Sequence, residues 1–354
     1  MKRVFASALS LVSMTIVIAA RAQSPSEAPR PLIVEFMPQV ADLEKAIYFY
    51  NELLGIQALP AAGDPRARRQ WYNTRPFLED MYGVGGQLRN FLVQAPNFNL
   101  QNEPLQIQAL QWRDAKEKAL HPRMQDPGAA RLILTVSNID LLAGRLKKGG
   151  AKAVTVGYAP VAIADTTGTG RAIAFDDGNG FFVELIQPPT LPVLGPGDAP
   201  LPYILAGDLE VTVADLDKSA KFFREVLGLS VTPDSSFHAE AKRLELLGIN
   251  GGQYREANIA WPDKTPQLRL IQFKGVDQKT LAPLVPDPNS TIIRLFVRDM
   301  DTLLAKVKAF PEAKIMNVSG GPTPRADHTP WLIVKLPGSV TYLQMVGLAN
   351  GRVQ

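Results

Sequence analysis

The strongest constraint on this chain is that it repeats itself. Residues 40–50 read VADLEKAIYFY and residues 213–223 read VADLDKSAKFF, and each segment is followed by a Leu-Gly pair. Residues 85–89 (GGQLR) are answered by residues 251–255 (GGQYR), so the order and approximate spacing persist. Weaker echoes begin at Val136 and Val297. The chain therefore looks like four copies of one unit, which are too few and too long for a solenoid of short repeats.

Each copy has the same local pattern. An alternating apolar strand comes first, as in residues 32–40 and 205–213, and an Asp or Asn follows where a helix N-cap belongs. A helix with apolar residues at helical spacing comes next and ends at a glycine, Gly55 or Gly228. Three more strands complete the unit, and the last of them cover residues 105–112, 181–187, 267–273 and 341–346. The pattern predicts an α+β protein built from four βαβββ units.

The first 22 residues have the pattern of an export signal. Lys2 and Arg3 precede a mostly apolar stretch, and the sequence Ala20-Arg21-Ala22 matches an A-x-A cleavage site. We expect cleavage near Ala22, a periplasmic or secreted protein, and no membrane association afterwards; an uncleaved anchor is the alternative. The remaining organisation that we expect is a disordered lead-in (23–31), a first domain (32–187), a proline-rich linker (188–202), a second domain (203–347) and a tail (348–354).

Composition excludes several classes of protein. The 354 residues contain no cysteine and only three histidines, which excludes disulfide scaffolds, iron–sulfur clusters and a cysteine nucleophile. The chain has 38 Lys and Arg residues and 34 Asp and Glu residues. Three of the basic residues lie in residues 1–22, so the rest of the chain has 35 basic and 34 acidic residues. A chain so nearly neutral has no electrostatic reason to bind nucleic acid. The oligomeric state is left open.

The repeated units resemble the vicinal oxygen chelate superfamily, which includes glyoxalases, extradiol dioxygenases and bleomycin resistance proteins. The resemblance rests on the capping Asp, the Leu-Glu-Lys helix start, the Leu-Gly helix end and the closing segment Asp176–Leu185, and it covers nearly all of residues 32–347. It implies two tandem domains, each made of two units. It says little about activity, because this fold hosts many chemistries.

The resemblance also implies where metal ligands would lie. In the superfamily one ligand comes from the first strand of a unit, seven residues before the capping residue, and another, usually Glu, from the last strand. The first-strand positions in this chain are Glu35, Arg131, Asp208 and Ile292. The last-strand positions are Gln108, Glu184, Arg269 and Gln344, although Tyr342 could replace Gln344.

An arginine at a ligand position argues against a metal. A guanidinium is always charged and offers no lone pair, so Arg131 would repel a cation and pair with Glu184 or Glu35 instead. We therefore expect a metal-free, cofactor-free cavity in the first domain, lined by Glu35, Gln108, Arg131 and Glu184. We expect it to bind a small organic molecule with an anionic group that Arg131 neutralises. Asp208, Arg269 and Gln344 are the second-domain equivalents.

Two other interpretations stay open. The protein could be a metal-dependent lyase, isomerase or dioxygenase that uses Glu35 and Glu184, since hard cations accept all-oxygen ligand sets. It could also be a structural or interaction protein whose degenerate sites hold buried ion pairs. A basic and aromatic insertion in the first unit, from Arg66 to Arg75, is either a lid over a ligand or a solvated loop.

Overall fold

The computed structural model describes residues 32–58, 69–94, 106–114, 121–165, 168–191, 203–261 and 267–348. The predicted export signal, the predicted lead-in, most of the predicted linker and nearly all of the predicted tail lie outside these residues. No helix among the described residues is long and apolar enough to cross a membrane.

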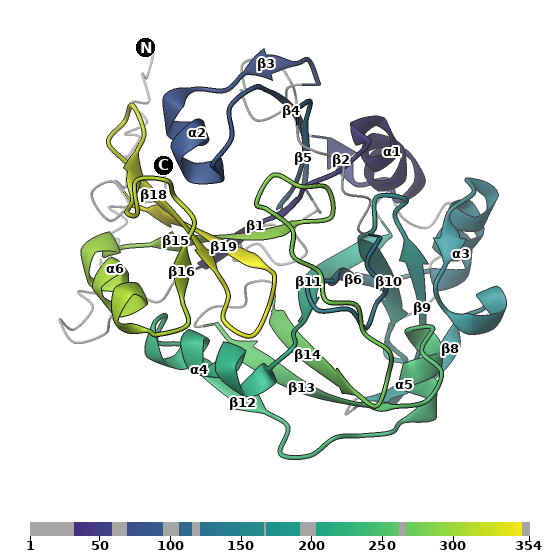
Figure 1. The fold of residues 1–354 in the computed structure, drawn as a ribbon. Coiled ribbons are helices and arrows are strands. Elements are labelled where there is room, and N and C mark those ends of the chain that lie inside the picture. Colours follow the sequence, from purple (N-terminus) through teal and green to yellow (C-terminus); the bar gives the residue numbers. More distant parts are fainter. Residues whose placement is uncertain are drawn as a thin grey trace, which may run out of the picture.

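The four expected units are present (Figure 1). The first contains β1 (Leu32–Pro38), α1 (Leu43–Ile47), which continues as the π-helix η1 (Tyr48–Leu53), β2 (Gln57–Ala58), β3 (Tyr72–Asn73), α2 (Pro76–Tyr82), β4 (Gln87–Gln94) and β5 (Gln106–Trp112). The second contains β6 (Ala130–Val136), α3 (Ile139–Lys148), β7 (Lys152–Ala153), the 3₁₀ turn η3 (Val156–Tyr158), β8 (Val161–Asp165), β9 (Gly168–Asp176) and β10 (Phe182–Gln187).

The second half of the chain repeats this order. The third unit contains β11 (Ile204–Thr212), α4 (Leu216–Glu225), β12 (Ser230–Pro233), α5 (Ala241–Leu246), β13 (Gln253–Ala260) and β14 (Leu268–Lys274). The fourth contains β15 (Thr291–Val297), α6 (Met300–Ala309), β16 (Lys314–Ile315), β17 (Thr323–Pro324), β18 (Pro330–Lys335) and β19 (Tyr342–Gly347). The α2 and α5 helices are extra elements of the first and third units.

The predicted helix caps are confirmed. The side chain of Asp42, Asn138, Asp215 or Asp299 accepts a hydrogen bond from a backbone N–H in the first turn of the helix that follows. Gly55 and Gly228 have φ angles of 72° and 67°, the left-handed conformation that glycine adopts most easily at a helix end.

The strands form two mixed sheets, and each sheet joins units from both halves of the chain. Sheet A has the order β16-β18-β19-β15-β1-β5-β4-β2 and combines the first and fourth units; sheet B has the order β12-β13-β14-β11-β6-β10-β9-β7 and combines the second and third. Antiparallel first strands meet at both centres, β1 with β15 and β6 with β11. Each half of the chain therefore contributes one unit to each sheet.

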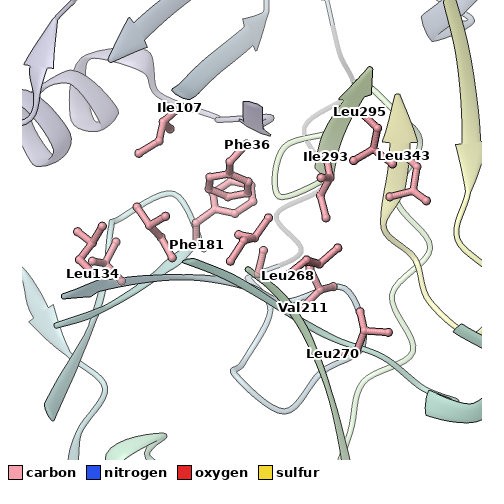
Figure 2. Packing of buried hydrophobic residues seen from close by; sticks show 14 of the residues in the cluster. Phe36, Ile107, Leu134, Phe181, Val211, Leu268, Leu270, Ile293, Leu295 and Leu343 are labelled. Carbon is pink, nitrogen blue, oxygen red and sulfur yellow. The ribbon is translucent and has the colours of Figure 1, made fainter. Parts of the chain in front are cut away.

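The main core lies between the two sheets (Figure 2). Because side chains alternate along a strand, one face of each sheet contributes residues such as Phe36, Ile293, Phe181 and Val211 to this core. Smaller apolar clusters cover the opposite faces, beneath α2 on sheet A and beneath α5 on sheet B. The polar positions that the sequence singles out lie on these two opposite faces.

Candidate functional site

Arg294 is the centre of a buried polar cluster on sheet A. Its Nε donates to Gln344 Oε1 at 2.6 Å and its Nη2 donates to Gln108 Oε1 at 3.4 Å. Its Nη1 donates to Glu35 Oε2 in an ion pair. All four residues are at most 6% exposed. We call Glu35, Gln108, Arg294 and Gln344 the Arg294 cluster.

Strand register brings these residues together. Glu35 and Arg294 are direct cross-strand partners on the antiparallel β1–β15 pair, and Arg294 is in register with Gln344 on β19. Gln108 lies two residues beyond Gln106, which is the partner of Glu35 on β5. Residues two apart on a strand share a face, so all these side chains lie on the face of sheet A that α2 covers.

Aromatic side chains surround the Arg294 cluster. The guanidinium carbon of Arg294 lies 4.8 Å from the centre of the Trp331 ring, a cation–π contact. Gln344 Nε2 donates to the hydroxyl of Tyr82 on α2 at 3.3 Å. Phe77 of α2 packs edge-on against Trp331, with the two ring centres 6.4 Å apart. Burial raises the pKa of Tyr82, so its phenol is uncharged and available as a hydrogen-bonding group.

Asp80 fastens α2 to the fourth unit. Its carboxylate accepts hydrogen bonds from Ser319 N at 2.7 Å, from Ser319 Oγ at 2.9 Å and from the Thr323 hydroxyl, while its carbonyl accepts from Val318 N at 2.8 Å. Although the partial burial of Asp80 acts to raise its pKa, the hydrogen bonds from Thr323 and Ser319 lower it. The α2 helix belongs to the first unit, so these hydrogen bonds hold α2 against the fourth unit, next to the Arg294 cluster.

We expect that Asp80→Ala will weaken the attachment of α2 to the fourth unit. Loss of charge-assisted hydrogen bonds should raise the rate of amide hydrogen exchange in α2 and in residues 316–324 by about tenfold or more, because a hydrogen bond to a charged group contributes a net stabilisation of roughly 1.5–3 kcal/mol. Hydrogen exchange followed by mass spectrometry measures this effect. Glu79→Ala, on the same helix, is the matched control, and equal protection in the Asp80 variant and the native protein would contradict the assignment.

A second polar cluster lies on sheet B around Arg131. Arg131 Nη1 is 3.1 Å from Glu184 Oε2, and its Nη2 donates to Glu210 Oε1. Arg243 of α5 is 3.2 Å from Glu184, 3.3 Å from Glu210 and 3.0 Å from Glu256. We call these five residues the Arg131 cluster. Three carboxylates therefore share two guanidiniums.

The charged groups of the Arg131 cluster shift one another's pKa values. Burial lowers the pKa of Arg243, but the three carboxylates outweigh it and raise that pKa well above its ordinary value. Burial raises the pKa of Glu256, but the guanidiniums of Arg243 and Arg131 hold it below its ordinary value. Burial also raises the pKa of Glu210, with Glu256 and Glu184 adding to that rise. The partners therefore outweigh burial at Arg243 and Glu256, whereas burial outweighs the partners at Glu210.

The predicted site residues fall into different groups. Glu35 and Gln108 lie in the Arg294 cluster with Gln344, whereas Arg131 and Glu184 lie in the Arg131 cluster on the other sheet. The expectation that the four residues line one cavity is therefore wrong, because it assumed that units one and two pair. Asp208 on β11 and Arg269 on β14 pair with each other at 3.2 Å and are partly exposed, and Ile292 is fully buried among apolar residues.

Sequence reasoning missed Arg294, Glu210, Arg243 and Glu256. Arg294 and Glu210 lie two residues after the positions that the resemblance marks, Ile292 and Asp208, and so share a strand face with them. The alternation of side chains along a strand could therefore have identified Arg294 and Glu210 as site residues. Arg243 lies on the short α5 helix, and no pattern in the sequence places it over sheet B.

The side chains present do not suit the divalent metal that the superfamily's fold implies. The Arg294 cluster contains one carboxylate, and that carboxylate is bound to a guanidinium. In the Arg131 cluster, every carboxylate lies within 3.3 Å of a guanidinium. Among the described residues, no three His, Asp or Glu side chains are placed to hold a metal ion. A divalent cation would have to displace a fixed positive charge, and metal-ligand chemistry requires neutral or anionic donors.

Comparisons with known proteins were made on sequence and on structure. No family model and no curated protein sequence matches the chain. Glyoxalase I from Zea mays superposes with a TM-score of 0.57 at 16% identity, over 90% of this chain and 92% of that chain. Two point mutants of the same enzyme give TM-scores of 0.55 at 15% and 16% identity, over 90% of this chain and 94% and 92% of theirs. At such low identity the likeness shows the fold alone. With its four βαβββ units in two mixed sheets, the chain has the vicinal oxygen chelate fold.

Proposed function

We propose that this protein binds a small organic molecule at the Arg294 cluster, without a divalent metal. The observation that carries the proposal is the place of Arg294. Its guanidinium is bonded to Glu35, Gln108 and Gln344, the residues that the family resemblance puts at metal-ligand positions. A few convergent polar groups within apolar walls are typical of small-molecule sites.

The Arg294 cluster is a better binding site than the Arg131 cluster. The helix that covers the Arg131 cluster inserts Arg243, whose guanidinium fills the polar face and completes an internal network. The helix that covers the Arg294 cluster presents a neutral phenol, Tyr82, and aromatic carbon. This contrast supports a structural role for the Arg131 cluster, in place of the ligand-binding role that the sequence predicted for Arg131 and Glu184.

A thermal-shift screen of the mature protein against a metabolite collection tests the proposal. A compound that binds the folded state raises the melting temperature in proportion to RT ln(1 + [L]/Kd). We expect at least one such compound, and we expect the shift to vanish in Arg294→Met. Because that change leaves Glu35 unpaired, the double variant Glu35→Met with Arg294→Met keeps the test interpretable, since it removes both charges. A shift that survives in the double variant would place the ligand elsewhere.

A metal-dependent enzyme that uses Glu35 and Glu184 has no support in the geometry. The two carboxylates lie on different sheets, on faces that point away from the core between the sheets. We expect metal analysis of the purified mature protein to find less than one divalent ion per ten chains. Stoichiometric zinc, nickel, manganese or iron that is lost in Glu35→Gln would contradict a metal-free site.

Export is part of the proposal. The leader pattern at residues 1–22 supports a cleaved signal, so the binding site would lie in the periplasm or outside the cell. We expect intact-mass measurement of the protein from its native host to give a chain that begins at or near Gln23, and fractionation to recover it outside the cytoplasm. A chain that retains its leader and sediments with membranes would instead indicate an uncleaved anchor.

A further inference from the structure

One guanidinium on sheet B contacts three carboxylates at once. Arg243 Nη1 lies 3.2 Å from Glu184 Oε1, and its Nη2 lies 3.3 Å from Glu210 Oε2 and 3.0 Å from Glu256 Oε1. The two Nη atoms are bonded to the same carbon, so the three carboxylates converge on one small volume. The carboxylates come from three strands, β10, β11 and β13, whereas Arg243 comes from the α5 helix.

Arg131 holds the opposite oxygen atoms of two of these carboxylates. Its Nη1 is 3.1 Å from Glu184 Oε2, and its Nη2 donates to Glu210 Oε1. These three residues are at most 2% exposed, whereas the side chain of Glu256 is 22% exposed. The oxygen atoms that face Arg243 therefore lie on the solvent side of the Arg131 cluster, where an ion from solution could reach them if Arg243 were absent.

We infer that Arg243 does in this protein the work of a bound divalent cation. Its three carboxylate partners form a cation site that the α5 helix keeps occupied with its own positive charge. Carboxylate oxygens and water are the donors that hard divalent cations such as Mn²⁺ favour. An ion in place of the guanidinium would draw each oxygen inward by roughly 1–2 Å, because hard cations bind oxygen at about 2.0–2.6 Å, and the flexible glutamate side chain allows this movement. This role goes beyond structural support and is independent of ligand binding at the Arg294 cluster.

The balance of charge explains why the site is closed in the native protein. A cation that entered the native network would meet two guanidiniums, which are always charged, and would have to displace one of them. Without Arg243, three negative charges would face the single positive charge of Arg131, and one divalent ion would restore neutrality. Arg269, the other cation that acts on Glu256, does not alter this balance, because it is paired with Asp208 at 3.2 Å.

Titration of Arg243→Ala with Mn²⁺ tests the inference, because the paramagnetic resonance signal of free Mn²⁺ reports binding directly. We expect this variant of the mature protein to bind one Mn²⁺ per chain at least tenfold more tightly than the native protein. We also expect Mn²⁺ to raise the melting temperature of the variant and not that of the native protein. Adding Glu256→Gln should weaken the binding at least tenfold, since it removes one charged ligand. Lys242→Ala, which removes an exposed positive charge from the same helix, is the matched control and should bind Mn²⁺ no better than the native protein.

A second variant guards against loss of the fold. Arg243→Ala with Glu210→Gln removes one charge of each sign and keeps an amide oxygen as a donor, and we expect it also to bind Mn²⁺ more tightly than the native protein. If a variant is unfolded without the ion, recovery of the native circular dichroism on adding Mn²⁺ supports the inference, and no recovery contradicts it.

Three other results would overturn the inference. They are a folded variant that binds Mn²⁺ no better than the native protein, stoichiometric Mn²⁺ binding by the native protein, and an affinity that Glu256→Gln leaves unchanged. The ligand screen at the Arg294 cluster is decided separately, because that cluster lies on the other sheet.

Discussion

Replacing Arg131 by methionine should lower the free energy of unfolding by about 3–5 kcal/mol, the range measured when one partner of a buried ion pair is removed. Arg131 is 1% exposed and lies against Glu184 and Glu210, which are equally buried. Its removal leaves three carboxylates with the single guanidinium of Arg243. Urea unfolding monitored by far-UV circular dichroism measures the change.

Two variants make this prediction specific. Arg171→Met removes an ion pair with Asp140 at 2.6 Å in which both side chains are largely exposed, and it should cost less than about 1 kcal/mol. The double variant Arg131→Met with Glu210→Met removes a charge of each sign and should recover more than half of the loss. A loss below about 1 kcal/mol for Arg131→Met alone would mean that the Arg131 cluster contributes little to stability.

A second large effect, on how the free energy of unfolding depends on pH, is expected from Asp177, in the loop between β9 and β10. The carboxylate is 3% exposed; it accepts from Asn179 N at 2.8 Å, Phe181 N at 3.0 Å and the Tyr50 hydroxyl at 3.1 Å. Burial raises the pKa of Asp177 to about 7, and the nearby charge of Asp176 adds to that rise. The folded protein therefore holds a proton that the unfolded chain releases above about pH 4.

The sign of the pH effect follows from this difference. Because the pKa in the folded state exceeds that in the unfolded state, the stabilisation is complete below about pH 4 and is lost as the pH rises to about 7. With about 1.4 kcal/mol per pKa unit, the loss amounts to about 4 kcal/mol. Asp177→Asn imitates the protonated side chain, so it should match the native protein at pH 4 and exceed its stability by about 4 kcal/mol at pH 8.

The comparison across pH is best made as a difference between variants, because other carboxylates also titrate in acid. Glu52→Gln changes an exposed acid on η1 and should show a difference that stays constant from pH 4 to 8. A constant difference for Asp177→Asn as well would mean that Asp177 ionises at its ordinary pKa despite its burial.

The pairing of the units has a physical reason in the strand register. On β1–β15, Glu35 opposes Arg294 and Met37 opposes Ile292; on β6–β11, Arg131 opposes Glu210. In the same register, pairing units one and two would place Arg131 opposite Met37. Pairing units three and four would place Glu210 opposite Ile292. Those arrangements would lose the two buried cross-strand ion pairs, Glu35–Arg294 and Arg131–Glu210, which the observed pairing forms.

Local signals in the sequence were sufficient for the elements of the fold. The repeated capping Asp or Asn, the glycine at the helix end and the alternation of apolar residues each act within a few residues of the chain. For that reason the predicted last strands agree with β5, β10, β14 and β19 to within one residue at either end. The α2 and α5 helices carry no comparable repeat signal and were not predicted.

The sequence by itself determined the four βαβββ units, their α+β class and the presence of arginine among the marked positions. The tertiary structure alone decided which units share a sheet, and with it which arginine meets which carboxylate. The physical reason is that four similar units offer equivalent strand edges, so the choice among them depends on contacts between residues as far apart as Glu35 and Arg294. Pairings at such separation depend on burial and cross-strand register, which no local pattern contains.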